Sequence, residues 1–147
     1  MSDFHHALDA VIADITPQPW DHTTPDGTRL RVIPDGQPAG EGEAEVLLQI
    51  TVDKTLAAQL GITTTDLPGL IGALTARRPW ETSTVLDSLL DLTYPDDASV
   101  LLLITETVWE DRDNHAVSTS IRLPEQQRLP LASALRRAYD VARGWED

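Results

Sequence analysis

The sequence predicts an α+β fold in which helices pack against a mainly antiparallel sheet. Two β-rich runs between Ser99 and Leu123 flank the polar segment Asp111 to Asn114, a pattern typical of a hairpin. Apolar and polar residues alternate between Glu45 and Val52, as in a half-buried strand. Helical spacing of apolar residues appears near both ends of the chain and between residues 53 and 92. We therefore expect strands and helices within one domain, residues 1–147, since a chain of this length can bury about two-thirds of its surface in a single core.

In chain order, the first predicted element is a helix from about Asp3 to Ile15, with its apolar residues on one face. Pro17 and Pro19 end this helix because proline lacks a backbone donor. Strands are expected between Trp20 and Val52, interrupted by a turn at Thr24 to Gly27. Within these strands the apolar residues alternate with two arginines after the turn.

Three helices are predicted next: Asp53 to Gly61, about Thr65 to Arg78, and about Thr82 to Leu92. In the first of them, aspartate is a suitable N-cap and glycine a suitable C-cap. A last helix is predicted from Leu131 to about Arg143, after the hairpin.

The hairpin register follows from treating Asp111 to Asn114 as its loop. Counting back from the loop pairs Glu110 with His115, Val108 with Val117, Ile104 with Ile121 and Leu102 with Leu123. A slip of one residue would exchange the two faces, so the apolar pairs support this register.

The composition of the chain excludes several classes of partner and of functional site. A formal charge of −13, from 24 acidic and 11 basic residues, opposes contact with nucleic acid and with anionic membranes, so we predict neither as a partner. The absence of cysteine excludes disulfides, thiolate zinc sites and cysteine nucleophiles. Since no basic leader or bilayer-length apolar run occurs, we expect a cytoplasmic protein of bacterial type.

Two motifs are weak. The segment Leu56 to Thr63, followed by Leu67 and Leu70, resembles a helix-turn-helix in its small residue, turn glycine and apolar spacing. That resemblance implies a DNA-reading helix, but Thr63 to Gly72 contains no basic residue, which favours a packed helical hairpin. His5 and His6 lie at helical spacing from Asp9, yet nothing supplies further ligands, so we predict no metal site.

These observations favour a non-catalytic binding or interaction protein that meets a basic protein partner or another copy of itself. The candidate partner-binding residues are Asp87, Asp91, Asp96, Asp97 and Trp109. The alternative is a small-molecule-binding or catalytic domain that uses the hydroxyl-lined face of the hairpin. Its residues would be Thr105, Thr107, Glu110, His115, Ser118, Ser120 and Arg122. No nucleotide-binding or hydrolase motif occurs, so we favour no enzyme activity and predict no cofactor.

Overall fold

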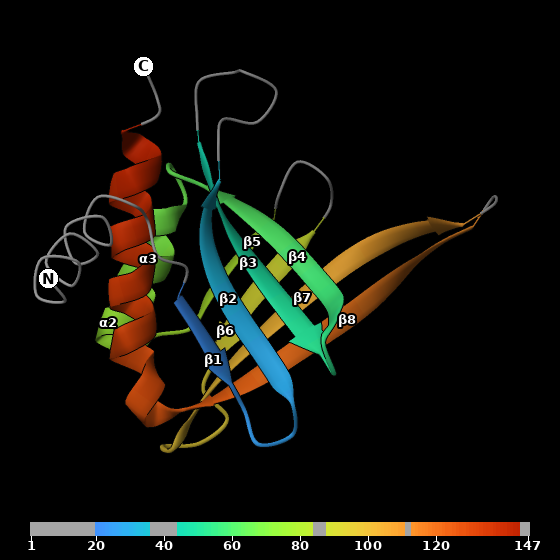
Figure 1. Cartoon of the computed structure of the whole chain (residues 1–147), viewed down its shortest axis with the longest axis horizontal. Coiled ribbons are helices and arrows are strands. Elements are labelled where there is room, and N and C mark those ends of the chain that lie inside the picture. The colour runs from blue at the N-terminus through green and yellow to red at the C-terminus, as the bar shows by residue number, and fades with distance from the viewer. Residues whose placement is uncertain (1–19, 36–43, 84–87, 111–112, 145–147) are drawn as a thin grey trace, which may run out of the picture.

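The computed structural model describes residues 20–35, 44–83, 88–110 and 113–144, which form two four-stranded antiparallel sheets and two α-helices (Figure 1). Sheet 1 contains β1 (Trp20–Thr23), β2 (Thr28–Asp35), β3 (Glu45–Val52) and β4 (Thr55–Thr63), in that order. Sheet 2 contains β5 (Trp80–Ser83), β6 (Leu89–Thr93), β7 (Ser99–Glu110) and β8 (Asp113–Pro124), also in chain order. The α+β prediction is confirmed.

Each sheet is followed by a helix. Helix α2 (Leu67–Ala76) follows sheet 1, while the 3₁₀-helix η2 (Glu125–Gln127) and helix α3 (Arg128–Arg143) follow sheet 2. The two α-helices pack against each other and stand at one side of the sheets (Figure 1). They confirm the helices predicted near residues 65–78 and 131–143. None of the helices among the described residues is long and apolar enough to span a membrane.

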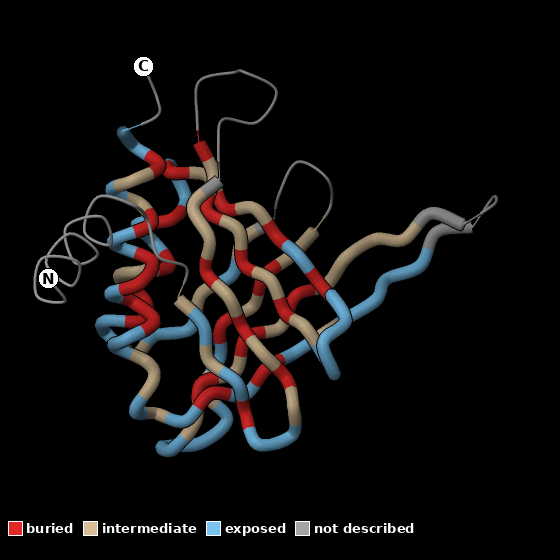
Figure 2. The backbone as a smooth tube through the Cα atoms, in the orientation of Figure 1, coloured by how far each residue is buried: buried red, intermediate tan, exposed pale blue. Residues whose placement is uncertain are grey.

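The core lies between the inner faces of the sheets and the helices. Buried and less buried residues alternate along the central strands (Figure 2), as expected when one face of each sheet is covered. The largest fully buried side chains come from both sheets and from α2: Leu30, Leu48, Ile50, Ile62, Leu67, Leu70, Leu74, Leu90, Leu92, Leu102, Ile104 and Ile121.

The β7–β8 hairpin is confirmed, but its predicted register is wrong by two residues. Leu102 pairs with Ile121, Ile104 with Thr119, and Val108 with His115. Because the shift is even, each residue keeps the face that was predicted for it. Strand β6 pairs with β7 only as far as Thr105, and the rest of the hairpin forms an arm that projects from the sheet (Figure 1).

The helix predicted from Asp53 to Gly61 is wrong, because this segment forms the β3–β4 turn and most of β4. Asp53 and Lys54 have φ of 51° and 69°, the left-handed geometry of a two-residue hairpin connection. This finding also removes the helix-turn-helix resemblance, since its first segment is a strand.

The helix predicted from Thr82 to Leu92 is wrong as well. Thr82 and Ser83 belong to β5 and residues 89–92 to β6, and Leu90 and Leu92 alternate with more exposed neighbours as in a strand. The helix predicted near Asp3 to Ile15 lies outside the described residues, as do His5, His6 and Asp9.

Candidate functional site

The outer face of sheet 1 is the side turned away from the core, and we define it by residues that alternate with buried ones along β1 to β4. In β2, Arg29 and Arg31 flank the fully buried Leu30, so the strand period places both arginines on this outer face. The polar members of the face include Asp21, Thr23, Arg29, Arg31, Glu45, Gln49, Thr51, Gln59 and Thr63.

The strand register lines up one polar row across this face. Asp21 is opposite Arg31, which is opposite Gln49, which in turn is opposite Gln59. The Gln49 Nε2 donates a hydrogen bond to Gln59 Oε1 at 2.7 Å. This pairing leaves each amide with further donor or acceptor capacity directed at solvent, because a primary amide has two N–H donors and two acceptor lone pairs.

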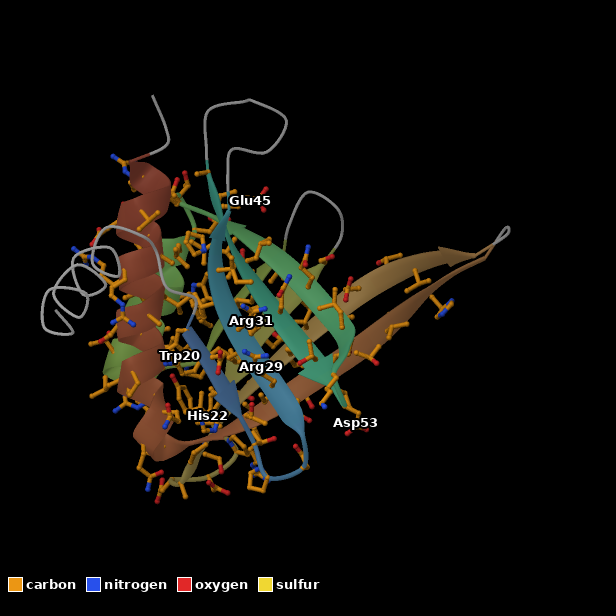
Figure 3. All side chains as sticks on the ribbon, viewed as in Figure 1. Trp20, His22, Arg29, Arg31, Glu45 and Asp53 are labelled. Carbon is orange, nitrogen blue, oxygen red and sulfur yellow. The ribbon has the colours of Figure 1, made fainter. Side chains whose placement is uncertain are left out.

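The two arginines differ in their partners. The Arg29 guanidinium donates to Asp21 Oδ2 at 2.6 Å, and the two side chains are 40% and 41% exposed. Arg31 Nε is shielded from solvent and has no hydrogen-bond partner among the described residues. Figure 3 labels both arginines along β2. Arg31 therefore has an unpaired donor at Nε, whereas the Arg29 guanidinium is engaged by Asp21.

An acidic side chain, Glu45, lies at one end of the same face. The Glu45 carboxylate lies directly over Gly61 of β4, in the space that a Cβ at this position would fill. The outer face of sheet 1 therefore carries amides and arginines in its middle and carboxylates at its margins.

The outer face of sheet 2 has a different character. It carries the hydroxyl-lined strip expected from the sequence, and Thr105 Oγ1 and Ser118 Oγ lie within hydrogen-bonding distance, 3.1 Å apart. Glu81 and Asp91 are opposite each other on β5 and β6. A hydrogen bond and repulsion from Asp91 raise the pKa of Glu81, as expected for two neighbouring carboxyl groups.

Arg122 is on this face too, and its guanidinium donates to Asp96 Oδ2 at 3.2 Å. Asp96 also accepts from the Ala98 backbone N–H at 2.9 Å, which is the main reason that the pKa of Asp96 is lowered. Arg122 is thus already engaged by an acid.

The candidate acidic residues are spread out rather than gathered. Asp91 is on β6, whereas Asp96 and Asp97 are in the turn between β6 and β7. Asp87 lies outside the described residues, and Trp109 occupies a β7 position near the end of the arm. As a partner-binding site, this set stays a prediction.

The alternative residues fall along the hairpin. Thr105, Thr107, Ser118 and Ser120 share the outer face as predicted, and the alternative ligand face also stays a prediction. The expected pairing of Glu110 with His115 is wrong, because Glu110 is opposite Asp113 and His115 is opposite Val108. No group of three or more potential metal-binding side chains occurs in the described part of the chain.

Sequence reasoning missed Arg29, Arg31, Gln49 and Gln59 as site residues. Their signal was the alternation of these polar residues with buried apolar ones in two strands of the same sheet. Chain-wide charge outweighed that signal in the prediction.

No protein-family model matches the chain, and no curated protein matches it by sequence. Solved structures do match its fold. A structure of MRP1/MRP2 from Trypanosoma brucei aligns with a TM-score of 0.63 at 15% identity and covers 97% of both chains. Structures of WHY3 and WHY1 from Arabidopsis thaliana align with TM-scores of 0.59 and 0.57, at 14% and 15% identity. They cover 87% of this chain and 89% and 92% of their own chains.

At these low identities, the structural matches show a shared fold alone. The matched proteins bind nucleic acid, which contradicts two predictions: function as a protein-interaction protein, and the exclusion of nucleic acid as a partner. The physical error lies in using one net charge for the whole surface. A charge of −13 is the sum over the whole chain, and it does not describe a sheet face that presents two arginines and an amide pair.

Proposed function

We propose that the protein binds single-stranded nucleic acid on the outer face of sheet 1. The observation that carries the proposal is the row of Arg31, Gln49 and Gln59 across this face, in a fold shared with nucleic-acid-binding proteins. The row combines a cation for phosphate with amides for base edges, and these are the two kinds of contact that nucleic-acid recognition requires.

Single strands fit this face better than a duplex does. An unpaired base offers its hydrogen-bonding edges to side chains such as the amides of Gln49 and Gln59, whereas a duplex buries those edges in base pairs and grooves. Duplex DNA also carries about one charge per 1.7 Å of its axis, and the two arginines of this face supply few cations to match that density. Helix α2 offers no basic side chain for a groove, since its sequence is LPGLIGALTA.

Charge favours sheet 1 over sheet 2. The outer face of sheet 2 carries the paired carboxyl groups of Glu81 and Asp91, and its Arg122 is bound to Asp96. A phosphate approaching that face would meet acids and an occupied cation. On sheet 1 it would meet Arg31, whose Nε has no hydrogen-bond partner among the described residues.

The test is a titration of labelled single-stranded DNA and RNA, about 20 nucleotides long, followed by fluorescence anisotropy at several salt concentrations. We expect wild-type binding that weakens as salt rises. Arg31→Gln should weaken it about five- to tenfold, and the slope of log K against log salt should become shallower by about 0.7, the value for one lost phosphate contact on a single strand.

Arg122→Gln is the matched control, because it removes one positive charge from an exposed arginine on the other sheet. It should leave the affinity within about twofold of wild type, as expected for an exposed charge outside the interface. Circular dichroism of each variant checks that the fold is kept. Absence of binding by wild type at low salt would refute the function, and equal losses in the two variants would refute the site.

A further inference from the structure

We propose that Asp21 is an internal competitor of nucleic-acid phosphate: it occupies Arg29 and thereby limits the affinity of the outer face of sheet 1. This inference rests on the proposed function. It concerns one carboxylate and one guanidinium whose contact lies at the edge of the candidate interface.

The strand register alone does not predict the ion pair between Asp21 and Arg29. The residue opposite Asp21 is Arg31, and the residue opposite Arg29 is Thr23. The Asp21 carboxylate nevertheless lies diagonally against Arg29, with 2.6 Å between Oδ2 and the guanidinium nitrogen. One arginine of the face is therefore bound by an acid, while its neighbour two residues along the strand has no acidic partner among the described residues.

A carboxylate and a phosphate compete for the same group. Both accept hydrogen bonds from the planar guanidinium, and both gain from its charge. A phosphate that binds Arg29 must displace Asp21 or lie beside it and meet its negative charge. Removing that charge should therefore convert Arg29 into a second phosphate contact.

The pair is accessible enough for this exchange. Both side chains are about two-fifths exposed, and β1 is a four-residue strand at the edge of the sheet. An ion pair exposed to this degree contributes little free energy, so a polyanion that gains several contacts elsewhere can replace it. The same small free energy limits the expected change in affinity.

The experiment repeats the single-strand titration with Asp21→Asn. We expect binding about two- to fivefold tighter than that of wild type, as expected from the small free energy of an exposed ion pair. The slope of log K against log salt should steepen by about 0.7, because one more phosphate is neutralised.

Asp97→Asn is the matched control for net charge, since Asp97 is an exposed carboxylate in the β6–β7 turn. It should change affinity less than Asp21→Asn does. In an Arg29→Gln background, Asp21→Asn should have no more effect than the control, because the arginine through which Asp21 acts is gone. Asp21→Ser serves as a second variant, and thermal unfolding checks that each protein is folded.

The outcomes separate this inference from the proposed function. If wild type binds and Arg31→Gln weakens binding, but Asp21→Asn matches Asp97→Asn or lowers affinity, the competitor role is refuted and the function stands. Retention of the Asp21→Asn effect without Arg29 also refutes the role. If neither wild type nor Asp21→Asn binds, the function and the inference fall together.

Discussion

Two glycines of helix α2 lie in different surroundings although they are only three residues apart. A Cβ added to Gly69 would lie 2.8 Å from Nε1 of the Trp80 indole, whereas one added to Gly72 would have no neighbouring atom within 4 Å. Trp80 is half-buried and packs against the core. Gly69 therefore allows the start of α2 to approach the first strand of sheet 2 closely.

We predict opposite effects of the same substitution at these two sites. Gly72→Ala should raise the free energy of unfolding by about 0.5 to 1 kcal/mol, because alanine has the higher helix propensity. Gly69→Ala should lower it by about 1 to 3 kcal/mol through overpacking against Trp80. Urea denaturation of both variants measures the difference. A gain of stability in Gly69→Ala equal to that in Gly72→Ala would show that the indole moves aside without cost.

At the same scale, the site residues could be recognised only in part from sequence. The alternation of Arg29 and Arg31 with apolar residues is visible in the sequence, and the structure places both arginines on the outer face of sheet 1. It could not show that Asp21 would bind Arg29 rather than the arginine opposite, because that choice depends on side-chain geometry across two strands.

Among the elements, β4 shows why some sequence patterns mislead. The register shifts between Ile50 and Thr51, where a bulge in the β3–β4 pairing places Leu56 opposite Thr51 on the outer side. Leu56 is consequently 53% exposed, while Ala58, Leu60 and Ile62 alternate inward. Leu56 and Leu60 are four residues apart, a spacing that one face of a helix and one face of a strand both allow, so this spacing alone could not distinguish the two structures.

Helices α2 and α3 could be predicted because their apolar stripes are uninterrupted. The contact between the two helices could not be predicted, since it is made by charged residues that are far apart in the sequence. Glu125 accepts hydrogen bonds from Arg128 Nε at 2.6 Å and from Arg77 Nε at 3.3 Å. Arg128 also donates to the backbone carbonyls of Leu74 and Thr75 at the end of α2, so this cluster joins the two helices.

The cluster predicts a pH dependence of stability. The hydrogen bond from Arg128, followed by that from Arg77, lowers the pKa of Glu125 below its ordinary value of 4.5. A group with a lowered folded-state pKa stabilises the fold above its unfolded pKa and loses that contribution as the pH falls through the folded one. Glu125→Gln should therefore be less stable than wild type at pH 7, and the difference should shrink as the pH falls below 4.5.

Thermal unfolding between pH 7 and pH 3 provides the measurement. Glu106→Gln, on the projecting arm, is the control for loss of one carboxylate. A difference between wild type and Glu125→Gln that persists unchanged at the lowest pH would show that the charge of Glu125 does not support the helix junction.

For the whole molecule, the distribution of charge over the surface matters more for nucleic-acid binding than the total charge does. The chain has a net charge of −13, yet the two outer sheet faces differ: sheet 1 presents Arg31 and an amide pair, and sheet 2 presents paired carboxyl groups. Sequence composition reports only the sum. The folding of two similar four-stranded sheets into one molecule separates these surfaces, and only the structure shows which side chains share a face.

The most direct test of the central claim is an NMR titration of the ¹⁵N-labelled protein with an unlabelled single-stranded oligonucleotide. We predict that the largest shift changes occur at the backbone amides of Arg29, Arg31 and Gln49 and at the side-chain amides of Gln49 and Gln59. The residues of the sheet 2 outer face, such as Thr105 and Ser118, should change little. Shift changes concentrated on sheet 2, or no changes at a saturating oligonucleotide concentration, would contradict the assignment of sheet 1 as a nucleic-acid-binding face.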